Sequence, residues 1–254
     1  MSRTAIVLGS LLALGAAGFL ADRIALSGVG AHSEKTGHFE IRYGAVSPEE
    51  VRSLAESLEE GYERIGRDLG TAPPATIRVT LYDSRWAYAR STGHWGASGN
   101  VEGPEVLHVL WEGDRTAANA VHELAHAITL QLLIDQEPQP FDAAAFDRKF
   151  STLPVWLWEA VACYEAGQSQ DALSLPYMQD GRYPSLAELS DRGKGQKIYA
   201  VGSSILSFLR ASWGENVTVR LLTSYGDLPA TLGVSDEEFA ARWNEWLRSG
   251  STKP

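Results

Sequence analysis

The chain has 254 residues and a formal net charge of −10, which argues against a nucleic-acid-binding protein, because contact with phosphates requires a basic face. Hydrophobic residues make up 44% of the sequence and charged residues 21%, a globular composition that excludes a wholly disordered chain. Cys163 is the single cysteine, so neither a disulfide within the chain nor a cysteine-rich metal site is possible.

The N-terminal residues predict a targeting segment rather than part of the fold. Residues 5–21 carry no charge, follow Arg3 and precede Asp22 and Arg23. This pattern is typical of an export signal or a marginal membrane anchor, and a buried core helix is the alternative. We therefore expect residues 1–31 to direct export and the rest of the chain to lie outside the cytoplasm, whether periplasmic, extracellular or membrane-anchored.

A linker and a single domain are expected next. Residues 32–37 have the composition of a linker, and the domain is predicted over residues 38–250. Its first segment, HFEIRY at 38–43, alternates apolar and polar side chains, which predicts a strand.

A long amphipathic helix over residues 48–69 follows. Ser47, Pro48 and Glu50 supply an N-cap, a proline at the first helical position and a capping-box glutamate. Apolar residues then recur at spacings of three and four, and Gly70 stands where a helix-ending glycine belongs.

The rest of the chain changes from strand patterns to helix patterns. Alternation predicts strands at 76–82 and, after a glycine-rich loop, at 105–111. Apolar spacing then predicts helices over 115–134, 155–166, 196–212, 215–225 and 236–248. Strands followed by helices indicate an α+β fold, with a small antiparallel or mixed N-terminal sheet and a helical C-terminal part.

The sequence His122-Glu123-Leu124-Ala125-His126 carries the clearest chemistry. Residues four apart lie on one face of a helix, so His122 and His126 can present imidazole nitrogens to one metal ion. Glu123 is turned by about 100° from His122 and is placed to act on a metal-bound water without being a ligand. The alternative is a solvated helix face that carries two histidines and a glutamate.

Residues 153–164 supply a candidate for a third ligand. A catalytic zinc takes three protein ligands and keeps its fourth position for water. Glu159 lies in a short and otherwise apolar helix, where burial of an unpaired carboxylate is costly unless it binds a cation. A surface glutamate on the polar stripe of an amphipathic helix is the alternative.

These two motifs together resemble the gluzincin metallopeptidases, the thermolysin-like peptidase MA group. In that group the HExxH helix is followed by a helix of pattern W-L-x-E-G-x-A-x-Y, which residues 156–164 match except for Ala160 in place of glycine. The order of the predicted elements over residues 38–247 is also similar. The resemblance implies a zincin-like metallopeptidase fold and the hydrolysis of peptide bonds in a peptide or protein substrate.

The resemblance also implies roles for single residues. His122, His126 and Glu159 would hold one Zn²⁺ ion, and Glu123 would be the general base. The strand at 105–111 would form the sheet edge on which an extended peptide pairs through its backbone.

Two further residues have two interpretations each. Tyr199 resembles a tyrosine that the family places beside the metal to donate a hydrogen bond to the oxyanion, and a half-buried core tyrosine is the alternative. Cys163 lies four residues after Glu159 on the same helix face. It is interpreted either as a small buried side chain or as a group that contacts the metal site.

Three functions therefore remain open on the sequence. They are an active zinc peptidase, a catalytically silent peptidase-like domain that binds peptides or partners, and a zinc hydrolase of a non-peptide bond. An aminopeptidase of the same group would carry G-x-M-E-N before the HExxH helix, whereas residues 96–103 read GASGNVEG, which favours an endopeptidase. The expected partners are a peptide or protein substrate and, through residues 5–21, a membrane.

Overall fold

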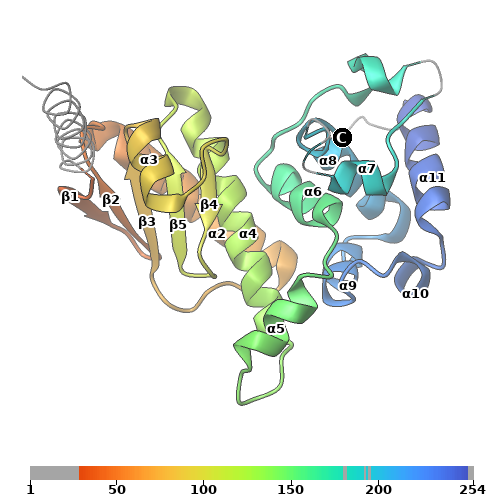
Figure 1. The fold of residues 1–254 in the computed structure, drawn as a ribbon, viewed down its shortest axis with the longest axis horizontal. Coiled ribbons are helices and arrows are strands. Elements are labelled where there is room, and N and C mark those ends of the chain that lie inside the picture. The colour runs from red at the N-terminus through yellow and green to blue at the C-terminus, as the bar shows by residue number, and fades with distance from the viewer. Residues whose placement is uncertain (1–28, 180–181, 192, 194–195, 251–254) are drawn as a thin grey trace, which may run out of the picture.

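The computed structural model describes residues 29–179, 182–191, 193 and 196–250 (Figure 1). The predicted targeting run at residues 5–21 lies outside these described residues. Within the described part, none of the helices combines the length and the apolar character that crossing a bilayer requires.

The described residues contain a mixed five-stranded sheet in the order β1-β2-β3-β5-β4. Strands β2, β3 and β5 run parallel to one another, and β1 and β4 pair antiparallel at the two edges. The strand bounds are β1 His32–Lys35, β2 Phe39–Tyr43, β3 Ile77–Tyr82, β4 Gly99–Val101 and β5 Val106–Leu110. The predicted α+β class with a small mixed sheet is therefore confirmed.

Two expectations about the edges of this sheet were wrong. Residues 32–37 are not simply a linker, because β1 occupies His32–Lys35 and pairs with β2. The strand predicted at 105–111 is not at the edge, because β5 lies between β3 and β4. The edge is instead formed by β4, within the segment that the sequence presents as a glycine-rich loop. Both edge strands are short and none of their residues is buried, so neither shows the apolar alternation that reveals a strand.

Helix α2 (Pro48–Leu69) forms as its local signals predict. Ser47 and Glu50 make the reciprocal capping box, and Gly70 ends the helix with a φ of 74°. The apolar face of α2 packs against the sheet and against α4 (Thr116–Asp135). Gly61 lets the two helices approach, since a Cβ at that position would lie 3.3 Å from the side chain of Leu124 in α4.

The C-terminal half is helical, and α4 lies between it and the sheet (Figure 1). The longer helices agree with the predicted ranges, whereas the sequence analysis did not identify α3, α5, α7 and α10. The remaining helices are α3 Arg85–Thr92, α5 Ala143–Phe150, α6 Val155–Glu165, α7 Leu186–Ser190, α8 Ile198–Trp213, α9 Val217–Thr223, α10 Leu228–Leu232 and α11 Asp236–Arg248. One hydrophobic core continues from β2 through α4 and α6 to α11.

Helix α6 packs closely on α8, and this contact positions residue 159. A Cβ at Gly202 of α8 would lie 3.0 Å from Cα of Ala160, so the two backbones meet at these small residues. A larger side chain at either position would push α6 away from α8. Ala160, the one departure from the family pattern, is therefore small enough for this helix contact.

Candidate metal centre

The HExxH segment lies in the middle of α4, which is buried on most of its surface. His122, Glu123 and His126 are only 7%, 9% and 5% exposed. A solvated helix face, the alternative left open by the sequence, is therefore wrong for these three residues. Buried polar side chains require partners, and α6 supplies one.

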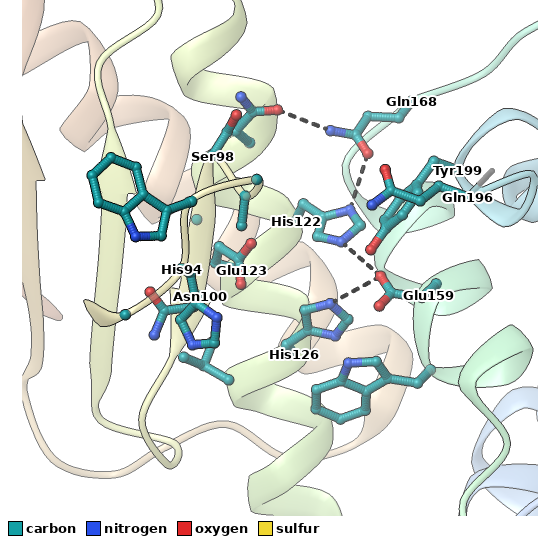
Figure 2. Close-up of a pocket in the computed structure, with 18 residues that line it drawn as sticks. His94, Ser98, Asn100, His122, Glu123, His126, Glu159, Gln168, Gln196 and Tyr199 are labelled. Carbon is teal, nitrogen blue, oxygen red and sulfur yellow. Dashed lines mark hydrogen bonds and ion pairs between the residues drawn. The ribbon is translucent and has the colours of Figure 1, made fainter. Parts of the chain in front are cut away.

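Glu159 projects from α6 toward both histidines (Figure 2). Its Oε2 atom lies 3.3 Å from Nε2 of His122 and 3.5 Å from Nε2 of His126. The side chain of Glu159 is 3% exposed, so it is not the surface glutamate of the alternative interpretation. These three residues are hereafter the His-His-Glu cluster, whose ligand atoms all lie within 4.8 Å of one another.

The donor set of the cluster fits a metal ion. Two imidazole nitrogens and one carboxylate oxygen are three ligands of the kind that a catalytic zinc uses. Burial tends to raise the pKa of Glu159, but its hydrogen bonds with His122 and His126 dominate and lower that pKa. The buried carboxylate is therefore an anion that requires positive charge beside it, supplied by a metal ion or by protonated imidazole.

The pKa of His122 follows the same logic. Burial acts to lower it, but hydrogen bonds with Cys163 and Glu159 outweigh burial and raise the pKa to about 10. The buried carboxylate of Glu159 thus favours positive charge on the neighbouring imidazole. The described residues hold no second group of three His, Cys, Asp or Glu side chains that converge in this way.

Gln168 orients the ring of His122, and the sequence analysis did not identify this residue. Oε1 of Gln168 lies 3.0 Å from Nδ1 of His122, which makes Nδ1 the protonated nitrogen and turns Nε2 toward the cluster. Nε2 of Gln168 donates to Oδ1 of Asn119 at 3.4 Å. Gln168 lies in the loop after α6, where no periodic pattern marks it.

The ring of His126 is held by aromatic stacking. Trp158 lies against it with the ring centroids 4.1 Å apart and the planes 7° from parallel. Phe150 in turn contacts Trp158 edge to face at 5.2 Å. The plane of the second histidine is thus set by packing, since stacked rings resist rotation.

Glu123 lies beside the cluster on the side of β4 (Figure 2). Its carboxyl group packs against the backbone of Gly99, where a Cβ would lie 2.6 Å from Oε1. Burial raises the pKa of Glu123 to about 7, and the charges of His122 and Glu159 act on it in opposite directions. The pKa of this carboxyl group is thus close to neutral pH.

Tyr199, at the start of α8, lies in the pocket rather than in the core. Its side chain is 37% exposed, and its ring centroid lies 6.0 Å from that of His122. Figure 2 shows its hydroxyl end directed toward the His-His-Glu cluster. Cys163 is fully buried, which confirms its interpretation as a small buried side chain, and its thiol lies 4.0 Å from the backbone oxygen of Tyr199.

A pocket of about 660 Å³ opens over the cluster between the sheet and the C-terminal helices. Residues 93–101 form one wall, which contains β4 and the loop before it. The opposite wall is formed by α6 and α8, including Trp158 and Tyr199. Glu123 and Glu159 are the acidic residues of the described lining, and that lining contains no lysine or arginine.

Comparison with protein-family models finds none that matches this chain, and a search of curated proteins finds no match either.

Proposed function

We propose that this chain is a zinc-dependent endopeptidase of the gluzincin type, with a zincin-like fold. The observation that carries the proposal is the convergence of His122, His126 and Glu159 on one buried point, with Glu123 beside it at the floor of an open pocket. Two imidazoles and one carboxylate leave a coordination position for water, the arrangement that distinguishes a catalytic zinc site from a structural one.

A zinc ion held by this cluster would supply a Lewis acid that acidifies water and polarises a substrate carbonyl group. The protein contributes the orientation of the ligands. Gln168 sets the tautomer of His122, and Trp158 sets the plane of His126. Glu159 completes the donor set from a different helix.

Glu123 acts as the proton carrier. It is buried beside the His-His-Glu cluster and lines the pocket, where a positioned carboxylate can transfer protons. Its carboxylate takes a proton from the attacking water and returns it to the leaving amine. Gly99 leaves the space that this carboxylate occupies, because a Cβ at that position would lie 2.6 Å from Oε1 of Glu123.

Tyr199 is proposed to stabilise the negative charge that develops on the carbonyl oxygen. Its hydroxyl group is a neutral donor on the side of the pocket formed by α8. A preorganised donor of this kind acts only when the charge appears, and it therefore favours the transition state over the substrate.

The lining of the pocket favours cleavage within a chain over cleavage at its ends. An aminopeptidase needs a carboxylate for the terminal ammonium group, and a carboxypeptidase needs a cation for the terminal carboxylate. The described lining offers no carboxylate beyond the two glutamates of the metal centre, and it contains no lysine or arginine. The edge of β4 borders the same pocket, so an extended peptide can pair with it through backbone hydrogen bonds.

We also propose that the chain acts outside the cytoplasm, on the basis of the uncharged run at residues 5–21. A reporter enzyme that folds to its active form only outside the cytoplasm should be active when it is fused after Lys35. Carbonate washing of membranes would separate an anchored form, which stays with the pellet, from a cleaved one. Reporter activity that is found only in the cytoplasm would contradict this placement.

The central experiment measures metal content and proteolysis on the same purified full-length protein. We expect one zinc per chain and cleavage of an unfolded protein substrate that a chelator abolishes and added zinc restores. Alanine at His122, His126 or Glu159 should remove both, whereas Glu123→Gln should keep the metal and lose a factor of about 10² to 10⁴ in rate.

Three results would contradict the proposal in different ways. Full zinc content in Glu159→Ala would remove Glu159 from the donor set. Bound zinc with no cleavage of any peptide would favour a peptide-binding domain or a hydrolase of another bond. Equal rates in wild type and Glu123→Gln would exclude the proton-transfer role.

A further inference from the structure

A tryptophan of the pocket wall and a second tryptophan in contact with it are unusually exposed. Trp95 and Trp86 are 57% and 45% exposed, and their rings meet at a tilt of 64° with centroids 5.3 Å apart. Trp95 belongs to the wall of the pocket, and Trp86, which is outside the described lining, lies against Trp95. Adjacent exposed aromatic rings are costly to hydrate and commonly mark a binding surface.

The side chain of Arg85 holds the backbone of the loop that carries Trp95. Nη1 of Arg85 donates to the backbone oxygens of Trp95 and Ala97, at 3.1 and 3.0 Å. Nη2 of Arg85 donates to Oε1 of Glu112 at 2.8 Å. The exposed ring is therefore attached to a fixed backbone, so little conformational entropy is lost when it binds a ligand.

A continuous chain of hydrogen bonds connects this loop to the metal centre. The other oxygen of Glu112, Oε2, accepts from Nδ2 of Asn119 at 3.3 Å. Asn119 accepts from Gln168, which contacts His122 (Figure 2). The position of Trp95 relative to the cluster is thus set by side chains of α3, of the segment before α4, of α4 itself and of the loop after α6.

We propose that Trp86 and Trp95 form a subsite for an apolar or aromatic side chain of the peptide substrate. This inference rests on the proposed function and deepens it. Two tryptophan faces offer a large apolar contact area and favourable ring geometry to such a side chain. The charge of Arg85 is already paired with Glu112, and the acidic residues of the lining belong to the metal centre. Apart from the imidazole of His94, the described lining therefore offers no group outside the metal centre that could pair with a charged side chain.

The test measures peptide binding separately from cleavage. It uses the zinc-loaded full-length Glu123→Gln protein and uncleaved peptides that differ at one scanned position, which carries Phe, Leu, Ala, Lys or Glu. Isothermal titration calorimetry should show about 10-fold tighter binding for Phe and Leu than for Ala at one position of the scan. Adding Trp95→Ala should reduce this preference to less than about 2-fold, with zinc content and affinity for the Ala peptide unchanged.

Phe141→Ala is the matched control, because Phe141 is also exposed, at 41%, and does not line the pocket. It should leave the preference intact. Four results would overturn the subsite. Two concern the peptides: equal affinity for all of them, or tightest binding of the Lys peptide. The other two are a preference that survives Trp95→Ala and no binding of any peptide. Selective binding without cleavage by the wild type would contradict only the peptidase proposal. Cleavage by the wild type with no apolar preference would contradict only the subsite.

Discussion

Glu123 lies so close to Gly99 that a Cβ at residue 99 would be 2.5 Å from Cγ and 2.6 Å from Oε1 of the glutamate. Side chains do not approach this closely, so any residue other than glycine at position 99 displaces the proposed base. The contact joins the edge strand β4 to helix α4, which carries the two histidines, and it places the proposed peptide-binding edge beside the proposed proton acceptor.

We therefore expect Gly99→Ala to lower kcat by about 10² or more while zinc content is retained, because a misplaced base transfers the proton poorly. Gly96→Ala is the matched control in the same wall, since a Cβ there has no neighbour within 4 Å. Steady-state kinetics and metal analysis on both variants test this. A wild-type rate in Gly99→Ala would show that Glu123 has no fixed position in the reaction.

Gln168 should influence how tightly the metal is held. Gln168→Ala removes the acceptor for Nδ1 of His122, and loss of such an outer partner typically lowers metal affinity by about 10- to 100-fold. Gln168→Glu keeps an acceptor and should restore most of the affinity. Competition with a chromophoric chelator measures the change. Gln131→Ala serves as the control, because Gln131 bonds Asp135 at the far end of α4. An unchanged affinity in Gln168→Ala would contradict the role.

Tyr199→Phe deletes one hydroxyl group at the pocket and leaves the ring in place. If this group donates to the oxyanion, kcat should fall by about 10²-fold with unchanged zinc content and thermal stability. Rates and melting temperatures are measured on the same preparation. A wild-type rate with a lowered melting temperature would instead assign the hydroxyl a structural role.

Acid should weaken the contact between α2 and the turn between β1 and β2. Oε1 of Glu59 accepts from Thr36 at 2.5 Å and from the backbone of His38 at 2.8 Å. Burial acts to raise the pKa of Glu59, but the hydrogen bonds from Thr36 and from the ring and backbone of His38 together lower it below the ordinary value of 4.5. A depressed pKa means that this contribution to stability is present above pH 4.5 and is lost as the pH falls through the lower, folded-state pKa.

Urea denaturation of wild type and Glu59→Gln over a pH series tests this linkage. The difference in free energy of unfolding between the two proteins should be largest near neutral pH and should shrink as the pH falls below 4.5. A difference that stays constant across the series would mean that Glu59 has the same pKa in the folded and unfolded chain.

Features that depend on neighbours along the chain could be predicted from the sequence. Helix α2 follows from its capping residues and from apolar residues three and four apart. The pairing of His122 with His126 follows from one turn of helix, because residues four apart share a face wherever the helix lies. These interactions are local, so the residue types and their spacing were sufficient to predict them.

The rest depended on which distant segments pack together. Glu159 reaches the two histidines only because α6 packs against both α4 and α8, and the sequence could suggest it only through a burial argument and a resemblance. The contact of Gly99 with Glu123 and the link from Arg85 to Gln168 are likewise made between residues far apart in the chain. The edge strands β1 and β4 pair with strands close to them in the sequence, but both are short and have no buried residue that would reveal them. Short strands and single polar contacts carry no periodic pattern, and the partners of such polar contacts are decided by which distant segments pack together.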